Sequence, residues 1–278
     1  SSQLLYVTKP LSGKAYATST NTDIFAYDLA SGSVKNLTES NKGYDVNPKF
    51  SPDGNFLTWQ SMERDGYEAD KNEVKIMDWK SGKTTNLTKD WDESVTGSVF
   101  WSQDSKMIYF NTAFRGTTQL FSLNPKTAKI SQITKGDFDV TDIFADQKNS
   151  LLVTRTDMNH SADLFSVDLK NGAMKQVTEV NKENYSKITP SKTELKMVKT
   201  SDGKEMGVWF HYPPNFDPNK KYPTLLYCQG GPQSALTQFF STRWNFALMA
   251  ANGYIVVAPN RRGMPGWGVE WNEAISGD

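Results

Sequence analysis

The sequence predicts a chain of two parts, in which blades of a β-propeller come first and the start of a doubly wound α/β sheet follows. Two observations support this prediction. A 16-residue segment with strand-like alternation occurs four times before residue 179. Near the other end, an apolar run, a Gly-Gly turn, a helical pattern and a second apolar run follow one another. Repeats with this spacing are typical of propeller blades, whereas the order strand, helix, strand is typical of a parallel sheet.

The repeated segment has the pattern of a β-hairpin. Its first strand alternates between apolar and polar residues, a turn follows, and a short second strand ends in Leu-Thr, Ile-Thr or Val-Thr. In three copies the turn contains Gly32, Gly82 or Gly172. The copies begin 50, 46 and 44 residues apart, which is the length of a propeller blade with four strands. They span residues 23–38, 73–88, 119–134 and 163–178.

The spacers between the copies supply the other half of each blade. Residues 50–59 and 101–110 each contain a strand, a tight turn and another strand, and a weaker copy lies at 144–153. Two hairpins make one blade, so residues 1–178 hold about three and a half four-stranded blades of an all-β propeller. Because an open stack would expose strand edges and apolar faces, we expect further blades ahead of Ser1.

The periodicity stops after residue 178. A polar connector at 179–192 leads to a second part, 193–278, which opens with a hairpin at 195–212. The chain is therefore predicted to consist of a propeller part, a linker and the first portion of an α/β domain.

A βαβ crossover is predicted within this second part. The runs 224–228 and 254–258 are apolar on both faces, as buried parallel strands are. Between them, apolar residues recur at helical spacing and predict a helix over 237–252, with Gly253 at its C-terminal cap.

The charge balance and composition exclude several classes of function. Lys plus Arg number 31, as do Asp plus Glu, so no basic surface for nucleic acid is predicted. No apolar run approaches the roughly 18 residues that a membrane helix needs. The single Cys228 cannot form an intrachain disulfide, and no cluster of Cys, His or carboxylates has the spacing of a metal site. We therefore expect no metal, no cofactor, no nucleic-acid partner and no membrane span.

The most informative motif is Gln229-Gly230-Gly231-Pro232, directly after the first of these apolar runs. A strand that ends in a Gly-Gly turn leaves backbone N–H groups uncovered at the end of a sheet, where they can stabilise an oxyanion. A plain strand-to-helix turn is the alternative, and the spacing taken alone favours it.

Together with motifs downstream, this tetrad carries a family resemblance. Residues 258–263 read Ala-Pro-Asn-Arg-Arg-Gly, and residues 266–268 read Gly-Trp-Gly. A propeller followed by these motifs resembles the prolyl oligopeptidase family of serine peptidases, in particular its bacterial dipeptidyl peptidases of type V. The resemblance implies that 193–278 is the N-terminal part of an α/β-hydrolase domain. It also implies an exopeptidase that releases dipeptides from the amino ends of short peptides, with a periplasmic or secreted location, and it leaves a homodimer open.

The resemblance further implies a triad of Ser, Asp and His, and none of the three is identified in this chain. No Gly-x-Ser-x-Gly occurs, and such hydrolases carry Ser, Asp and His in that order. His160 and His211 precede the expected nucleophile, so we expect both to be structural. The nucleophile is therefore expected outside this chain, and the 278 residues are expected to be an inactive fragment.

By the same resemblance, the N–H of Gly231 is expected to be the oxyanion donor, with Gly230 next and Gln229 beside them. The family more often has His or Tyr at the position of Gln229. This difference leaves open whether the Gln side chain assists the oxyanion or contacts the substrate.

Candidate substrate-binding residues lie in two places. Arg261 and Arg262 follow the carboxyl end of a strand, where ligands bind in open α/β sheets, so Arg262 is a candidate for binding a substrate carbonyl or carboxylate. An ion pair with Glu270 or Glu273 is the alternative.

The second place is the loop 61–72, which concentrates four carboxylates. A dipeptidyl peptidase has to recognise a free amino terminus, and a carboxylate is the natural partner of an ammonium group. Glu63 or Glu68 is therefore the candidate anchor, and a solvated charged loop is the alternative.

Two functions remain open at this point. One is a serine peptidase whose propeller admits short peptides. The other is a propeller-based binding protein with a degenerate or absent hydrolase half. A Gly-x-Ser-x-Gly and a His beyond Asp278 would favour the enzyme.

Overall fold

A computed structural model of the chain describes residues 3–147 and 149–276. Its first sheet contains β1 (Gln3–Thr8), β2 (Asp23–Asp28) and β3 (Val34–Asn36), and its second contains β4 (Asp45–Phe50), β5 (Phe56–Ser61), β6 (Glu73–Asp78) and β7 (Thr84–Asn86). The third contains β8 (Val99–Trp101), β9 (Ile108–Phe114), β10 (Thr117–Leu123) and β11 (Ile130–Gln132), and the fourth contains β12 (Asp139–Gln147), β13 (Ser150–Asp157), β14 (His160–Asp168) and β15 (Met174–Gln176).

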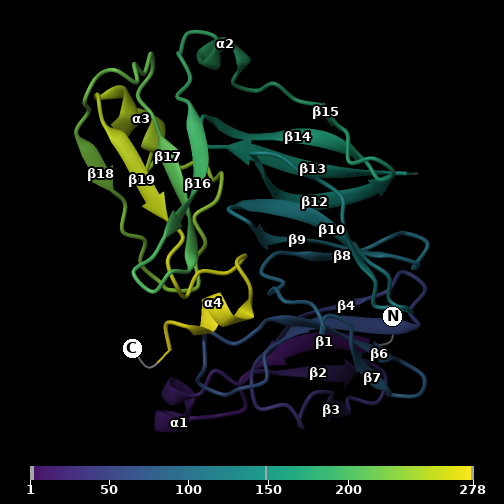
Figure 1. Cartoon of the computed structure of the whole chain (residues 1–278). Helices are drawn as coiled ribbons and strands as arrows, with labels where there is room; N and C mark the ends of the chain where they lie inside the picture. Colours follow the sequence, from purple (N-terminus) through teal and green to yellow (C-terminus); the bar gives the residue numbers. More distant parts are fainter. Residues whose placement is uncertain (1–2, 148, 277–278) are drawn as a thin grey trace.

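These four sheets are propeller blades, which confirms the predicted architecture of the first part. Strands that are neighbours in a blade are consecutive in the sequence and pair antiparallel. The blades follow one another from β1–β3 at the bottom of Figure 1 to β12–β15 at the top. One three-stranded and three four-stranded sheets agree with the expectation of about three and a half blades.

The threonine that ends each repeat explains why the hairpin recurs. Its hydroxyl oxygen accepts a hydrogen bond, 2.9 or 3.0 Å long, from the backbone N–H of the second residue of the same repeat. This bond ties the end of the outer strand to the start of its neighbour and satisfies a buried donor. The four pairs are Thr38 with Ile24, Thr88 with Val74, Thr134 with Leu120 and Thr178 with Leu164.

Apolar side chains between neighbouring blades form the core of the propeller part. Val74 and Ile76 of the second blade pack with Phe110 and Phe121 of the third. Leu151 and its neighbours in the fourth blade pack against the opposite face of the third. Each such side chain contributes roughly 1.5–3 kcal/mol when it is fully buried, so the blades stabilise one another through their faces.

The fifth sheet belongs to the second part of the chain and stands beside the blades in Figure 1. It contains β16 (Thr193–Lys199), β17 (Glu205–His211), β18 (Thr224–Leu226) and β19 (Ile255–Pro259), in the order β16-β17-β19-β18. The pair β18 and β19 is parallel, and α3 (Phe246–Ala251) lies between them in the sequence. The predicted βαβ crossover is therefore confirmed, with the apolar strand β19 in the interior of the sheet.

The length predicted for the crossover helix is wrong. Only Phe246–Ala251 is helical, with Asn245 as the N-cap whose Oδ1 accepts from the N–H of Leu248 at 2.8 Å. The residues before it are held in a non-helical conformation by contacts from elsewhere in the chain. The N–H of Gln238 donates to Asp139, and Asn260 bonds both backbone groups of Leu236. These partners compete with the helix for the same backbone groups.

Three further short helices were not predicted. They are α1 (Gly13–Thr18), α2 (Lys182–Tyr185), which lies in the connector, and α4 (Val269–Glu273). Figure 1 shows α4 between the fifth sheet and the lower blades. Met158 of the fourth blade packs in one apolar cluster with Trp209 and Val256 of the fifth sheet. The two parts of the chain therefore share a packed interface.

Candidate functional site

The Gly-Gly turn follows β18 and is held from both sides. The carbonyl oxygen of Gln229 accepts a hydrogen bond from Nη2 of Arg261 at 2.9 Å. The carbonyl oxygen of Gly231 accepts one from the N–H of Ser234 at 3.1 Å. Gly231 has φ +60°, a left-handed conformation that costs a non-glycine residue roughly 1–2 kcal/mol. This conformation explains why a glycine stands at the second position of the turn.

Two backbone donors of the turn are free. The N–H groups of Gly230 and Gly231 have no hydrogen-bond acceptor among the residues that the structure describes. A Cβ added at either glycine would meet no atom within 4 Å, so the space beside them is open. The side chain of Gln229 is engaged elsewhere in the turn, because its Nε2 donates a hydrogen bond to Oγ of Ser234 at 3.2 Å. Uncovered donors of this kind can stabilise an oxyanion.

A hollow of about 810 Å³ lies next to this turn, between the propeller and the second part of the chain. Pro232, which completes the tetrad, is in its wall, and so is Glu68 from the propeller loop 61–72. The other walls come from the α1 region, which Figure 1 places on the same side of the molecule as α4. The lining is completed by Lys9, Thr22 and residues 17–20, 66–69, 233 and 275–276.

The loop that carries Glu68 is fixed on the α1 side. Oδ1 of Asp65 accepts hydrogen bonds from Oγ of Ser19 at 2.7 Å and from the N–H of Thr20 at 2.8 Å. The hydroxyl of Thr20 in turn accepts from the N–H of Gly66 at 2.8 Å. The hydroxyl of Ser19 and the neighbouring N–H groups hold the pKa of Asp65 below its usual range, which favours the charged acceptor.

The same loop is also fixed on the α4 side. Arg64 forms ion pairs with Asp70, at 2.5 Å, and with Glu273 of α4. Nδ2 of Asn272 donates to the carbonyl of Ala69 at 2.8 Å. Burial raises the pKa of Asp70, but hydrogen bonds from Arg64 and neighbouring N–H groups outweigh it and leave the pKa below its usual range. Glu68 therefore lines the hollow from a loop that is held on both sides.

The structure does not bring Glu63 and Glu68 into the same hollow. Glu63 lines a separate one of about 510 Å³, with Lys71 and Glu73 among its walls. Its backbone N–H donates to Oδ2 of Asp70 at 2.8 Å. Of the two predicted amine anchors, Glu68 is the one that faces the hollow beside the Gly-Gly turn.

Arg262 pairs with a carboxylate, but not with one of the two that the sequence suggested. Its guanidinium forms an ion pair with Asp202 and lies 5.0 Å from the centre of the Trp271 ring. Glu270 pairs with Lys204, and Glu273 pairs with Arg64. Arg262 thus links the β16–β17 turn to the loop after β19.

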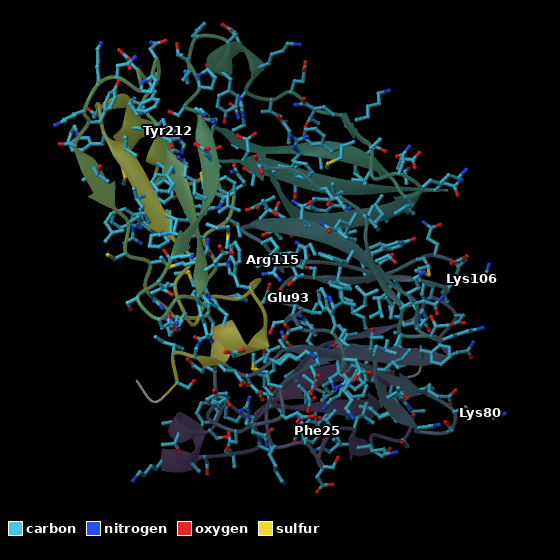
Figure 2. The ribbon with its side chains drawn as sticks, viewed as in Figure 1. Phe25, Lys80, Glu93, Lys106, Arg115 and Tyr212 are labelled. Carbon is cyan, nitrogen blue, oxygen red and sulfur yellow. The ribbon has the colours of Figure 1, made fainter. Side chains whose placement is uncertain are left out.

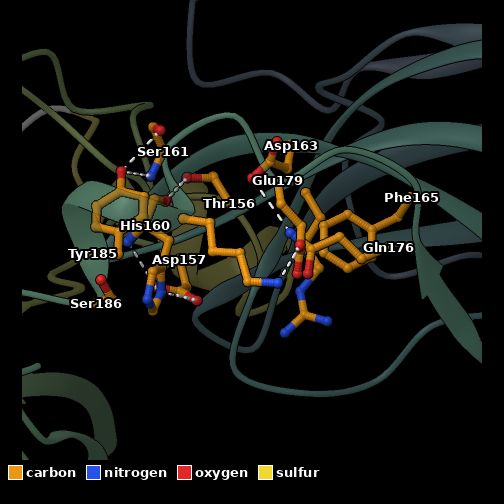
Figure 3. Close-up of a pocket in the computed structure, with 12 residues that line it drawn as sticks. Thr156, Asp157, His160, Ser161, Asp163, Phe165, Gln176, Glu179, Tyr185 and Ser186 are labelled. Carbon is orange, nitrogen blue, oxygen red and sulfur yellow. Dashed lines mark hydrogen bonds and ion pairs between the residues drawn. The ribbon is translucent and has the colours of Figure 1, made fainter.

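Neither histidine lies in the hollow beside the turn. His211 is buried, burial lowers its pKa to about 4, and its ring nitrogens have no hydrogen-bond partner in the described part of the chain. His160 pairs with Asp157, with Nδ1 2.8 Å from Oδ1, and packs edge-on against Tyr185. Figure 3 shows this pair at a hollow of about 460 Å³ near the connector, which shares no wall with the hollow beside the Gly-Gly turn.

Sequence reasoning missed two features of the site. The contact of Arg261 with Gln229 depends on how the loop after β19 lies against the turn. The propeller carboxylates Glu93 and Asp139 bind backbone of the second part of the chain, at Gly268 and at Gln238. The position of Arg261 after a strand's carboxyl end is the only hint that the sequence offers.

The described residues contain no group of three or more His, Cys, Asp and Glu side chains arranged to hold a metal ion. Over the same residues, no helix combines the length and apolar character that crossing a membrane requires.

Comparison with known proteins gives two family matches. A model of the TolB beta propeller domain matches residues 14–209, and the model of the prolyl oligopeptidase family matches residues 240–278. Dipeptidyl-peptidase 5 of Porphyromonas gingivalis is 46% identical over 275 residues, which is 99% of this chain and 40% of that protein. Dipeptidyl-peptidase 5 of Aspergillus fumigatus is 34% identical over 247 residues, 84% of this chain and 33% of that protein. The chain thus spans at most 40% of the length of these curated relatives.

Solved structures share the fold. Pyrococcus horikoshii acylaminoacyl peptidase superposes with a TM-score of 0.78 at 19% identity, over 99% of this chain and 41% of that chain. Porphyromonas gingivalis dipeptidyl peptidase 4 gives a TM-score of 0.66 at 18% identity, over 92% of this chain and 37% of that chain. These likenesses confirm a partial propeller followed by the beginning of a hydrolase domain.

Proposed function

This chain belongs to the prolyl oligopeptidase family of serine peptidases, and from that membership we propose that its protein releases dipeptides from the amino ends of short peptides. The relatives named dipeptidyl-peptidase 5 support this proposal because they match nearly the whole chain. In the proposed reaction, a serine hydroxyl attacks the carbonyl carbon of the peptide, and the carbonyl oxygen becomes negatively charged. The nucleophile is proposed to lie outside these 278 residues.

The observation that carries the proposal is the pair of free N–H groups at Gly230 and Gly231. Both glycines are exposed, so their N–H groups are open to solvent and can be reached by the carbonyl oxygen of a bound peptide. Here both donors border open space next to a hollow of about 810 Å³. We assign them to the oxyanion, with Gly231 as the principal donor and Gly230 beside it.

Glu68 is the proposed anchor of the substrate's amino terminus. It lines the same hollow as Pro232, and the loop that carries it is fixed on both sides. A carboxylate on a loop held in this way can bind an ammonium group without the cost of ordering the loop backbone. An anchor at a fixed distance from the oxyanion donors would limit cleavage to a set number of residues from the amino end.

The activity itself can be tested by labelling. Treating the protein at the full length of its relatives with a fluorophosphonate should modify one serine, whereas the 278-residue chain should remain unlabelled. Absence of any labelled serine in the longer protein would favour a propeller-based binding protein instead.

The role of Glu68 can be tested with Glu68→Gln. Loss of a hydrogen bond to a charged group costs about 1.5–3 kcal/mol, so KM for peptides with a free amino end should rise about 10-fold or more. Peptides with a blocked amino end should be unaffected. Glu63→Gln is the matched comparison, because Glu63 lies in a separate hollow. Equal effects of Glu68→Gln on free and blocked peptides would contradict the assignment.

A further inference from the structure

Arg261 makes an unusual set of contacts for a charged side chain. Its Nη2 donates to the carbonyl of Gln229 at 2.9 Å, and its Nη1 donates to the carbonyl of Arg262 at 2.9 Å. Within the described residues, no carboxylate lies at ion-pair distance from it. The neighbouring Arg262, in contrast, is paired with Asp202. The charge of Arg261 is therefore directed at backbone carbonyls, one of which belongs to the Gly-Gly turn.

Holding the Gln229 carbonyl fixes the peptide unit that begins the turn. A trans peptide is planar, so its N–H points opposite to its C=O. With the carbonyl of Gln229 bound to Arg261, the N–H of Gly230 points away from the guanidinium. At the other end of the turn, the N–H of Ser234 holds the carbonyl of Gly231. The unit between them carries the N–H of Gly231 and forms no hydrogen bond with any residue that the structure describes, so it takes its orientation from these two anchors.

Such anchors matter because the turn contains two glycines. Glycine has the widest range of backbone conformations and loses the most conformational freedom when it is fixed. Nothing packs against Gly230 or Gly231 within 4 Å of where a Cβ would stand, so side-chain packing cannot order them. The two glycines are therefore ordered by the hydrogen bonds to the carbonyls of Gln229 and Gly231.

An arginine suits this position better than a lysine. Its planar guanidinium presents several N–H donors in a fixed fork and can bind two carbonyls at once, whereas an ammonium is a single flexible charge. Hydrogen bonds from a charged donor are also stronger than those between neutral groups.

We infer that Arg261 is a positioning residue: by binding the Gln229 carbonyl it orients the N–H groups of Gly230 and Gly231 toward the oxyanion. This inference rests on the proposed function for its catalytic consequence. The ordering of the turn by Arg261 does not depend on that function and can be measured separately.

The first experiment measures the order of the turn in the 278-residue chain. Amide ¹⁵N relaxation gives order parameters for Gly230 and Gly231, with about 0.85 typical of rigid backbone and values below about 0.6 typical of flexible backbone. Arg261→Ala should lower both values from the rigid toward the flexible range, and Arg261→Lys should give intermediate values. Arg243→Ala is the matched control, because Arg243 is exposed and, among the described residues, forms no hydrogen bond with residues 229–232. Unchanged order parameters in Arg261→Ala would overturn the inference.

The second experiment measures kinetics in the protein at the full length of its relatives. Removing one oxyanion donor costs roughly 10²–10³-fold in kcat, so disordering the donors with Arg261→Ala should lower kcat by about 10–100-fold. KM should stay within about two-fold, and Arg261→Lys should recover part of kcat. A loss confined to KM, or no recovery by Lys, would contradict a positioning role.

The two experiments separate the possible failures. If the unmutated protein has no fluorophosphonate-reactive serine, the proposed function is wrong, and the relaxation data still decide whether Arg261 orders the turn. If serine labelling succeeds but Arg261→Ala leaves both kcat and the order parameters unchanged, only the inference about Arg261 is wrong.

Discussion

Two buried carboxylates of the propeller, Glu93 and Asp139, hold the hydrolase portion in different ways. Both oxygens of Glu93 accept from the single N–H of Gly268, each at 3.2 Å. Asp139 accepts three separate bonds, from the N–H of Thr118 at 2.7 Å, the hydroxyl of Thr237 at 2.6 Å and the N–H of Gln238 at 3.1 Å. Figure 2 labels Glu93 at the boundary between the blades and the hydrolase portion.

Burial is the largest influence on the pKa of each carboxylate, and hydrogen-bond donors offset part of it. Burial raises the pKa of Glu93 from 4.5 to about 7, and the Gly268 N–H and the charge of Arg115 offset only part of this effect. Burial also raises the pKa of Asp139, but its three donors keep the value to about 6. In both groups the cost of burying the charged form outweighs the hydrogen bonds that favour it, so each contributes most to the free energy of unfolding when it is protonated. That contribution is lost over different ranges of pH as the two groups ionise.

The largest effect is expected for Asp139→Ala. This change leaves three buried donors without an acceptor, at about 1–3 kcal/mol each, so the free energy of unfolding should fall by about 4 kcal/mol. Urea unfolding followed by tryptophan fluorescence measures it. Asp137→Ala is the control, because Asp137 is exposed and should change stability by less than about 0.5 kcal/mol. Similar losses for the two variants would show that the three bonds of Asp139 contribute little.

A smaller effect, confined to one range of pH, is expected for Glu93→Gln. The pKa of Glu93 is raised in the folded protein, so its contribution is fully present below about pH 4.5 and is lost as pH rises through about 7. This difference in pKa corresponds to up to about 3 kcal/mol in the free energy of unfolding of the unmutated protein.

Glutamine keeps an acceptor oxygen for Gly268 but does not titrate. The free energy of unfolding of Glu93→Gln should therefore decline less between pH 5 and 8 than that of the unmutated chain. Unfolding curves at four or more pH values measure the slope. An unchanged slope would mean that Glu93 is not the group that titrates.

The smallest effect is expected for Thr237→Val, which removes one of the three hydrogen-bond donors to Asp139 and so brings its number of donors closer to that of Glu93. Loss of the 2.6 Å hydroxyl bond should cost about 1 kcal/mol. Because that bond favours the charged form, its removal raises the pKa of Asp139 further, and the loss should be larger at pH 8 than at pH 5. Thr242→Val, at an exposed position, should show no such dependence on pH.

The repeats could be predicted from the sequence because each one contains its own stabilising contact. The hydroxyl of Thr38 bonds the N–H of Ile24 within a single 16-residue copy, and the same bond recurs in the other three. The alternation of apolar and polar residues and the recurring position of the threonine were therefore enough to predict the hairpins. The helix predicted over 237–252 was wrong because its first residues bind Asp139, which is about 100 residues earlier in the chain.

Of the candidate site, the position of the turn could be predicted, whereas the roles assigned to its residues stay predictions. A strand followed by two glycines pointed to the turn at Gly230 and Gly231, and the structure finds both N–H groups free there. The choice between Glu63 and Glu68 could not be made from the sequence, because it depends on which side of their loop faces the hydrolase portion. That orientation is set by distant partners such as Ser19 and Asn272.

The strand β18 has a practical consequence for work with the 278-residue chain. It is the edge strand of its sheet and pairs on one side with β19, while its residues Leu225 and Leu226 are exposed. An unpaired apolar edge of this kind is a template to which another extended segment can add. Samples should thus tend to associate as their concentration increases, and a lysine in place of Leu226 would be a sensible safeguard before spectroscopy.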